Sequence, residues 1–329
     1  TANRRLSIAA MSHNTISSPI FKADLHCHSY FSGRAKHMRL IGARDCYSPP
    51  RDVYLTARRR GMNLVTITDH DSIDGCRQLL DEMGNLPDFV IGEEVTTFVP
   101  EFGDSIHIAV YGITEAHHSD LQHLAGNASE LVAYLRQHQI LFALNHFFHD
   151  FRHHRRLGEY LHTMAHLFGV VEVQNGAMQA EHNEMVTEVL EFLSQQGKRF
   201  SSIAGSDAHT LRRIGTTYTA SFARTREEFL GDIRNGRTFV GGRHATHLAI
   251  ALDIYGVVLR YYPNVLTNRK EFGFWERLKN IALSLGCSPF LFIPYVIALK
   301  HARRERQHLA HLRQALSRLY PGERTSPAT

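Results

Sequence analysis

Short apolar or β-branched runs alternate with helical patterns from Phe21 to about residue 235, and this alternation constrains the fold more than any other feature. It is typical of βα units that build a parallel sheet. The expected strands begin at residues 21, 63, 89, 105, 140, 169 and 200. The expected helices span residues 49–60, 72–83, 119–138, 156–167, 179–196 and 226–235. Seven strands with polar ends, and no glycine-rich phosphate loop, favour a closed (β/α) barrel over an open doubly wound sheet.

The alternation predicts three parts of the chain. Residues 1–20 are rich in Ser, Asn and Thr and show no apolar core of signal-peptide length, so we expect a loose tail. Residues 21–244 are expected to form the α/β barrel. Residues 245–329 show a helical pattern with a basic end, and we expect a helical C-terminal extension.

Residues 280–299 carry no charge over 20 positions and are flanked by lysine and arginine. That length reaches what a membrane-spanning helix needs. Gly286, Pro289 and Pro294 interrupt the run, however, and a hydrophobic hairpin with basic flanks can also lie at a bilayer surface. Peripheral membrane contact and packing against the barrel therefore both stay open.

The cysteines and the net charge restrict the classes of protein to which the chain can belong. Cys27, Cys46, Cys76 and Cys287 lie far apart and form no CxxC pair, which indicates neither a disulfide framework nor a cysteine zinc site. A reducing compartment fits best, and we expect a cytoplasmic protein, with membrane association open. The 37 lysines and arginines exceed the 32 acidic residues, which favours anionic partners without marking a nucleic-acid binder.

The first expected strand ends in the motif DLHCHS, which contains Asp24, His26 and His28. Because side chains alternate along a strand, these three residues should point to one side and Cys27 to the other. Imidazole is the commonest metal-ligating side chain, and the chain has 23 histidines. Two imidazoles on one face are therefore candidate metal ligands.

Later strand ends carry further imidazoles and carboxylates. His70 in TDHD is bracketed by Asp69 and Asp71, which, like Asp24, can hold ligand rings through hydrogen bonds. Because strand ends of a (β/α) barrel assemble active sites, we expect these groups to converge. The eight candidate ligands are His26, His28, His70, Glu94, His107, His146, Asp207 and His209. Such a set exceeds the needs of one tetrahedral ion and favours zinc, manganese or iron over copper or an oxygen-lined magnesium site.

The motifs DLHCHS, TDHD, GEEV, IHIAVYG, LNH and GSDAH occur in this order between about Phe21 and His244. Together they resemble the polymerase and histidinol phosphatase (PHP) superfamily, in particular its stand-alone members. The resemblance implies a distorted seven-stranded (β/α) barrel that uses a cluster of two or three divalent ions to hydrolyse phosphoesters. It also implies that Glu94 rather than Glu93 faces the ions, because the family's bridging residue lies two positions after a glycine, here Gly92.

The resemblance implies three metal sites. It implies a first ion held by His26, His28, Glu94 and Asp207, a second held by Glu94, His107 and His146, and a third held by His70 and His209. The chain departs from the family at Gly33, where many members carry an aspartate or a histidine. The third ion is therefore expected to bind weakly, to recruit water, or to take a ligand such as His37 or Asp45.

The resemblance and the ligands together predict hydrolysis of phosphomonoester or phosphodiester bonds. A bound metal lowers the pKa of water to about 7, and the resulting hydroxide can attack phosphorus. The candidate catalytic residues are Glu94, Asp207 and His209, with His209 as one source of the leaving-group proton. Arg34 and Arg212 are candidate phosphate contacts. The roles of Glu172 and Asn175 in VVEVQNG stay open.

Three functions stay open for this chemistry. A basic surface and the likeness to stand-alone members favour a nucleotide or a short oligonucleotide as the substrate, as for a nuclease. A small phosphorylated metabolite, as for a phosphatase of the histidinol phosphate type, is the first alternative. A metal-binding scaffold with little activity, motivated by Gly33 and by residues 280–299, is the second.

Overall fold

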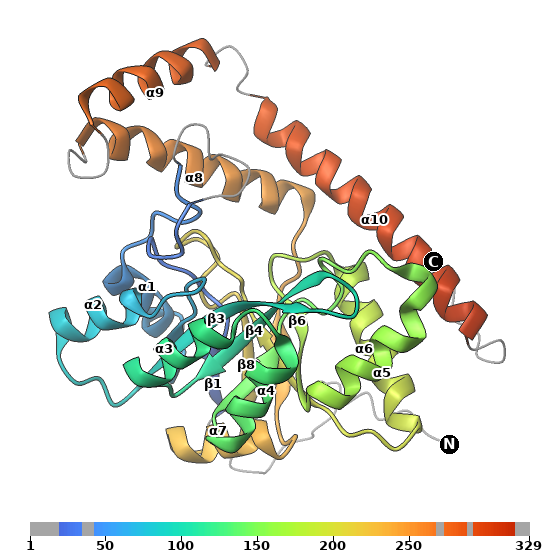
Figure 1. The fold of residues 1–329 in the computed structure, drawn as a ribbon. Helices are drawn as coiled ribbons and strands as arrows, with labels where there is room; N and C mark the ends of the chain where they lie inside the picture. Colours follow the sequence, from blue (N-terminus) through green and yellow to red (C-terminus); the bar gives the residue numbers. More distant parts are fainter. Residues whose placement is uncertain (1–19, 35–42, 268–272, 288–291, 320–329) are drawn as a thin grey trace, which may run out of the picture.

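The computed structural model describes residues 20–34, 43–267, 273–287 and 292–319. In these residues nine strands form one sheet, in the order β7-β6-β5-β4-β3-β2-β1-β8-β9 (Figure 1). The strands are β1 Phe21–Asp24, β2 Leu64–Ile67, β3 Phe89–Val99, β4 Asp104–Tyr111, β5 Leu141–Leu144, β6 Val170–Asn175, β7 Ser201–Gly205, β8 Thr217–Ser221 and β9 Phe239–Gly242. All seven expected strands are present, but the predicted strand count of seven is wrong.

The two additional strands, β8 and β9, are short and rich in Thr, Ser and Gly, so neither shows the apolar run of a buried strand. β8 pairs antiparallel with β1 and with β9. The sheet is also less parallel than expected, because β4 runs antiparallel to both β3 and β5. Only four residues separate β3 from β4, and so short a connection allows a hairpin but no crossover to a parallel strand.

The sheet closes nearly into a barrel. The segments that follow β1 and β7 lie side by side: the Asp207 amide donates to the His26 carbonyl at 2.7 Å, and the His28 amide donates to the Ala208 carbonyl at 3.1 Å. Asp24 joins the same two segments, because its carboxylate accepts hydrogen bonds from the Ser206 amide and hydroxyl at 2.8 and 2.6 Å. The carboxyl ends of these two strands are thereby fixed relative to each other.

Seven helices accompany the sheet between residues 50 and 234. They are α1 Pro50–Arg59, α2 Asp74–Met83, α3 Glu115–Leu124, α4 Ala128–Gln137, α5 Leu157–Leu167, α6 Ala180–Gln195 and α7 Arg226–Arg234. The single helix expected over residues 119–138 is in fact α3 and α4. The break falls at Gly126 and Asn127, where the Asn127 side chain caps α4 by accepting from the Ser129 amide at 3.0 Å.

Three long helices follow the sheet: α8 His247–Thr267, α9 Phe274–Cys287 and α10 Ile293–Leu319. The C-terminal half of α10 packs against α5 and α6 through Leu309, Leu312 and Leu316, which belong to the main hydrophobic core (Figure 1). No helix among the described residues has the length and apolar character needed to cross a bilayer. The segment 280–299 falls on α9 and α10, and residues 288–291 of it lie outside the described residues. The domain boundaries at residues 20 and 244 stay predictions.

Candidate metal centre

The centre of the site is Glu94 on β3, whose side chain is fully buried. Its Oε2 atom lies 3.0 Å from His70 Nδ1 and 3.6 Å from His28 Nε2. Its Oε1 atom lies 3.1 to 3.2 Å from one ring nitrogen each of His26, His107 and His146. One carboxylate is thus surrounded by five imidazoles that come from four different segments of the chain.

The fold explains why these segments meet at Glu94. On the β3–β4 hairpin, Thr96 lies opposite His107, and side-chain alternation puts Glu94 and His107 on the same face. A parallel bridge joins Glu94 to His70, which follows β2. Asn145, after β5, donates from its amide to the His107 carbonyl at 3.1 Å and from its side chain to Glu94 Oε1 at 2.8 Å.

The second carboxylate of the cluster is Asp207, which follows β7. Its Oδ1 atom lies 3.5 Å from His26 Nε2, 3.3 Å from His28 Nε2 and 3.7 Å from His209 Nδ1. Ligand atoms gather in four overlapping groups, each within 4.8 Å, and together these groups include all eight candidate ligands. The groups are His28, His70 and His209; His26, His146 and Asp207; His26, His28 and Glu94; and His70, Glu94 and His107.

Three of the four non-glycine residues with positive φ in the described part of the chain lie in this cluster or beside it. They are His146 at 25°, Asp207 at 48° and Asp71 at 49°. A positive φ is unfavourable for residues with a side chain, and such positions concentrate at functional sites. The backbone is therefore strained where it presents two of the eight side chains.

The protonation states of the two carboxylates and of His28 favour metal binding, whereas Glu94 raises the pKa of His26, His70 and His146 against the effect of burial, so that ions would have to displace protons there. Burial would raise the pKa of Glu94, but the adjacent His26, His107 and His70 hold it well below its usual value. Asp207 behaves in the same way next to His26 and His28. Burial, followed by the nearby His209, lowers the pKa of His28 to about 3. Two charged carboxylates and a neutral imidazole are the forms that coordinate divalent ions.

Several buried atoms of the cluster have no hydrogen-bond partner of suitable geometry. They are Nε2 of His26, Nε2 of His28, Oε2 of Glu94 and both ring nitrogens of His107. Such orphaned atoms are costly unless something satisfies them. Imidazole and carboxylate donors without thiolate suit divalent ions. The intervening Cys27 points away, as expected, because its thiol donates to the Thr66 carbonyl at 3.1 Å. The site therefore fits divalent metal ions.

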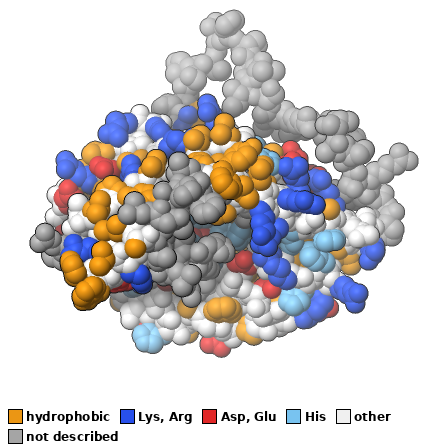
Figure 2. All heavy atoms as spheres, turned by 90° about the horizontal axis from the view of Figure 1, so that it is seen from above, with side chains coloured by type: hydrophobic (Ala, Val, Ile, Leu, Met, Phe, Trp, Pro, Cys, Tyr) orange, Lys and Arg blue, Asp and Glu red, His pale blue; other side chains and the backbone are white. Residues whose placement is uncertain are grey.

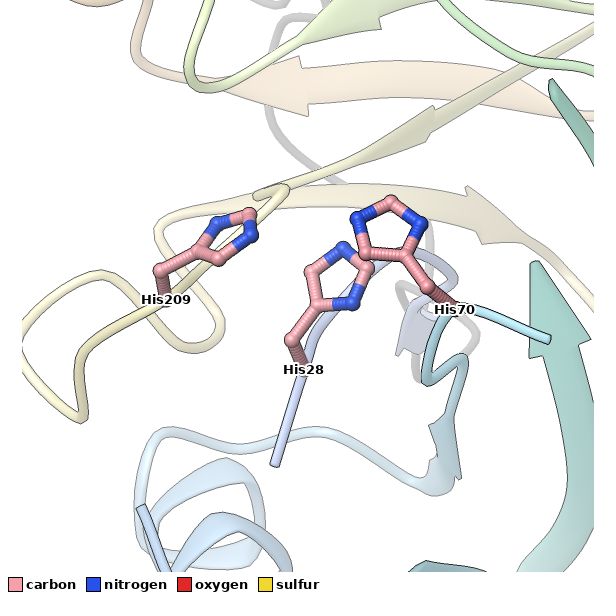
Figure 3. A group of neighbouring side chains, drawn as sticks. All are labelled: His28, His70 and His209. Carbon is pink, nitrogen blue, oxygen red and sulfur yellow. The ribbon is translucent and has the colours of Figure 1, made fainter. Parts of the chain in front are cut away.

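At the outer edge of the cluster, His28, His70 and His209 lie close together on the loops after β1, β2 and β7 (Figure 3). Asp45 completes this group, since its Oδ2 atom lies 3.1 Å from His209 Nε2 and 3.7 Å from His70 Nε2. Burial opposes protonation of His209, but Asp45 and Asp207 raise its pKa to about 10.

Asp45 reaches this position through a local pairing with Gly33. The Asp45 amide donates to the Gly33 carbonyl at 3.1 Å, and an antiparallel bridge joins Arg34 to Arg44. Asp45 thus lies next to Gly33, the position at which many members of the family that the sequence resembles carry an aspartate or a histidine. His37, the other suggested substitute, lies outside the described residues.

Two aspartates, the buried Asp69 and the exposed Asp71, accept hydrogen bonds that position the segments carrying the ligands. Asp69 accepts from the Ser29 amide and hydroxyl, both at 2.6 Å, and from the Ser32 hydroxyl at 2.8 Å. The Ser32 oxygen also lies 2.8 Å from His28 Nδ1, so that Asp69 orients His28 through Ser32. Asp71 accepts from the Thr96 amide at 2.6 Å and so ties the loop after β2 to β3.

Glu172 on β6 is a supporting residue whose role the sequence left open. Its Oε1 atom lies 3.0 Å from His26 Nδ1, and its Oε2 atom accepts from the His146 amide at 3.0 Å. Asn175 links Glu172 to Asp207, because its side-chain nitrogen lies 2.9 Å from one carboxylate and 3.1 Å from the other. A buried carboxylate in an otherwise apolar strand was the available signal.

The two candidate phosphate contacts lie in different surroundings. Arg212 donates to the Ala249 carbonyl at 2.9 Å and to Asp253 Oδ1 at 3.1 Å, so that its guanidinium is held against α8. Arg34 is exposed and lies one residue after Gly33. The structure therefore brings together the eight candidate ligands, while Arg212 makes its described contacts with the helical extension.

Residues 190–238 match the family model described as PHP-associated. An uncharacterised protein of Methanocaldococcus jannaschii, MJ1587, is 38% identical over 79 residues, a match that covers 23% of this chain and 44% of that protein. The family model thus matches 49 of the 329 residues, and the match to MJ1587 spans less than half of that protein's length.

The matches to solved structures have low sequence identity and TM-scores below 0.5. A two-domain protein from Bacteroides vulgatus, described as containing a predicted PHP-like metal-dependent phosphoesterase, is 16% identical with a TM-score of 0.48, over 75% of this chain and 74% of that one. PsfC from Pseudomonas syringae is 14% identical with a TM-score of 0.49, over 74% of this chain and 99% of that one. A putative metal-dependent phosphoesterase from Bifidobacterium adolescentis is 17% identical with a TM-score of 0.42, over 65% of this chain and 96% of that one.

Proposed function

We propose that the chain is a metal-dependent phosphoesterase whose ions are held by the eight clustered side chains. The observation that supports this most directly is that Glu94 and Asp207 each contact several imidazoles from separate segments. Two or three divalent ions bound there would supply positive charge at a phosphoryl group and would acidify water. Zinc, manganese and iron all suit the donor set.

The chain's own residues would position the ions and handle protons. Glu94 would be shared between ions, because its two oxygens face different imidazoles. His209 is the proposed proton donor to the leaving group, because a quarter of its side chain is exposed while most of the cluster is buried. Asp45 is the proposed replacement for the ligand that Gly33 cannot supply.

The substrate class is part of the proposal. A formal charge of +5 and the likeness to stand-alone PHP proteins favour nucleotides or short oligonucleotides. Amino-alcohol and sugar phosphates represent the small-metabolite alternative. Turnover of both panels by the full chain with added Mn²⁺ would separate these classes by their relative kcat/KM.

The central experiment compares Glu94→Gln with the neighbouring Glu93→Gln. Glu93 is equally buried but points away from the cluster, where it lies 2.9 Å from His118 Nδ1 and accepts from Gln122 at 2.7 Å. Burial raises the pKa of Glu93 to about 7, so glutamine mimics it well. We expect Glu94→Gln to lower aryl phosphodiester hydrolysis by more than about 100-fold and to reduce bound metal, and Glu93→Gln to change either by less than about threefold.

The outcome separates hydrolase from scaffold. Metal bound by the wild-type chain without turnover of any phosphomonoester or phosphodiester would contradict the proposed activity and favour a metal-binding scaffold. Equal losses in the two variants would instead contradict the placement of the ions at Glu94. Metal content is measured by elemental analysis of the purified chain, and folding by circular dichroism.

A further inference from the structure

One face of α8 carries apolar side chains that are each more than a third exposed in the described part of the chain. Leu248, Leu252, Leu259, Tyr262 and Leu266 are all exposed, and they follow one another at intervals of 4, 7, 3 and 4 residues. At 3.6 residues per turn these intervals place all five on a single stripe. Leu259, for example, is 67% exposed. A stripe of this length on a surface helix marks an interaction site.

Exposed apolar side chains also lie on the next two helices. On α9 they include Phe274, Leu278 and Trp275, which is 77% exposed. On the N-terminal half of α10 they include Tyr295, Val296, Ile297 and Leu299. We call the exposed apolar residues of α8, α9 and this half of α10 the extension surface. The aromatic residues are of the kind that settles at membrane–water interfaces.

The charge on these helices has one sign. Within their described residues, every charged side chain that is exposed is a lysine or an arginine: Arg260, Lys279, Lys300, Arg303, Arg304, Arg306 and Arg318. The acidic residues there, Asp253, Glu276 and Glu305, are all partly buried. Seen from above, hydrophobic side chains gather next to lysine and arginine side chains (Figure 2).

Two of the three helices that carry the extension surface, α8 and α10, contact the barrel, and α9 packs against α8. Asp253 of α8 accepts from the Thr210 hydroxyl at 2.9 Å, and Tyr261 and Val265 of α8 pack with Ala43. Glu305 of α10 accepts from the Gln179 side chain at 2.6 Å. The exposed apolar face is therefore presented in a fixed orientation rather than by a loose segment.

We propose that the extension surface binds the headgroup region of an anionic lipid bilayer. Apolar and aromatic side chains would enter the boundary between headgroups and acyl chains, while the basic residues would meet the negative headgroups. Charge complementarity favours this partner over a second copy of the chain, because a self-complementary contact would bring two basic surfaces together. The inference does not depend on the proposed hydrolysis.

The chain contains a reporter for this contact, since Trp275 is its only tryptophan. We expect its fluorescence to shift to shorter wavelength when the full chain meets vesicles of phosphatidylcholine mixed with phosphatidylglycerol, and the chain to sediment with them. Vesicles of phosphatidylcholine alone should bind at least tenfold less protein. Rising salt should weaken the binding, because it screens the basic residues.

Variants identify the surface. The double variant Leu278→Glu with Val296→Glu should lower vesicle binding at least tenfold, and Lys300→Gln with Arg303→Gln should lower it severalfold at low salt. Phe222→Ser, which alters a residue that is 65% exposed beside β8, is the matched control and should bind as wild type. The proposal is overturned if Trp275 emission stays unchanged with anionic vesicles. It is also overturned if the chain elutes as a dimer that Leu278→Glu dissociates, because a second copy would then cover this face.

Discussion

At the scale of single residues, Gly205 shows how tightly the backbone around the ligands is packed. A Cβ atom at this position would overlap Cβ of His26 and would lie 2.5 Å from its backbone nitrogen. We predict that Gly205→Ala lowers the free energy of unfolding by about 2–4 kcal/mol, measured by urea denaturation, and lowers bound metal. Gly231→Ala in α7 is the control, since its Cβ would meet nothing within 4 Å and should stabilise the helix by about 0.5–1 kcal/mol. Equal effects would contradict the packing argument.

Asp45 allows a second residue-level test. If it holds the third ion, Asp45→Asn should remove about one equivalent of metal per chain, leave the other ions bound, and lower activity by about 10- to 100-fold. Asp74→Asn is a suitable control, because Asp74 is an exposed residue on α2 whose carboxylate lies 3.4 Å from Arg77. Full metal content in the Asp45→Asn chain would show that Asp45 only orients His209.

The sequence anticipated the candidate ligands better than the residues that position them. Most of the ligand histidines follow directly after strands, where the barrel topology predicts convergence, while Glu94 and His107 lie within β3 and β4 and share one face of the hairpin. Asp45 follows the stretch 35–42. The length of such a stretch does not determine where the residue after it lies relative to the other ligands. Glu172 lies within a strand. Its position in the sequence does not distinguish a carboxylate that contacts a ligand from one that caps a neighbouring helix.

At the scale of elements, His308 of α10 contacts the loop after β5. The stability that this contact contributes should depend on pH. His308 Nε2 lies 3.0 Å from the Phe148 carbonyl, and its Nδ1 lies 3.0 Å from His154 Nε2. Burial lowers the pKa of His308 to about 4, and the nearby His154, Arg152 and His182 lower it further against the effect of the Phe148 carbonyl. Neutral His308 is thus the form that the fold requires.

The sign of the effect follows from proton uptake on unfolding. Between the ordinary histidine pKa of 6.5 and about 4, the unfolded chain binds more protons at this position, so stability falls as the pH falls through this window. We predict a loss of about 1–2 kcal/mol, discounted for partial exposure. His308→Gln should flatten the pH dependence of unfolding over this range, and His162→Gln, at an exposed position of α5, is the control variant. If the slope of the unfolding free energy against pH stayed unchanged in His308→Gln, this role of His308 would be contradicted.

The same scale shows what sequence patterns can and cannot give for elements. The seven expected strands were found because each is an apolar run bounded by polar residues. β8 and β9 were not predicted, because their sequences TYTAS and FVGG lack such a run. β8 is held by antiparallel pairing with β1, and β9 by antiparallel pairing with β8. The division between α3 and α4 depends on Gly126 and Asn127, which lie inside an otherwise continuous helical pattern.

At the scale of the whole molecule, metal binding should stabilise the barrel, because the ligands come from strands that lie far apart in the strand order. His26 and His28 follow β1, while Asp207 and His209 follow β7 at the edge of the sheet. Without ions, the buried Nε2 atoms of His26 and His28 lack hydrogen-bond partners, whereas unfolding would expose them to water. Ions that bind only the folded chain therefore raise its stability in proportion to the logarithm of their concentration over Kd.

We predict that chelation lowers the midpoint of thermal unfolding by roughly 5–10 °C, as expected for loss of an ion present at about 100 times its Kd in a domain of this size. Restoring Mn²⁺ or Zn²⁺ after removal of the chelator should recover the midpoint. The Glu94→Gln chain should unfold at nearly the same temperature with and without chelator, and Glu93→Gln should respond like wild type. Scanning calorimetry in the two conditions makes the comparison. If neither chelator nor added metal changed the wild-type midpoint of thermal unfolding, the cluster would be held together by its own carboxylate–imidazole contacts. The case for a metal centre would then fail.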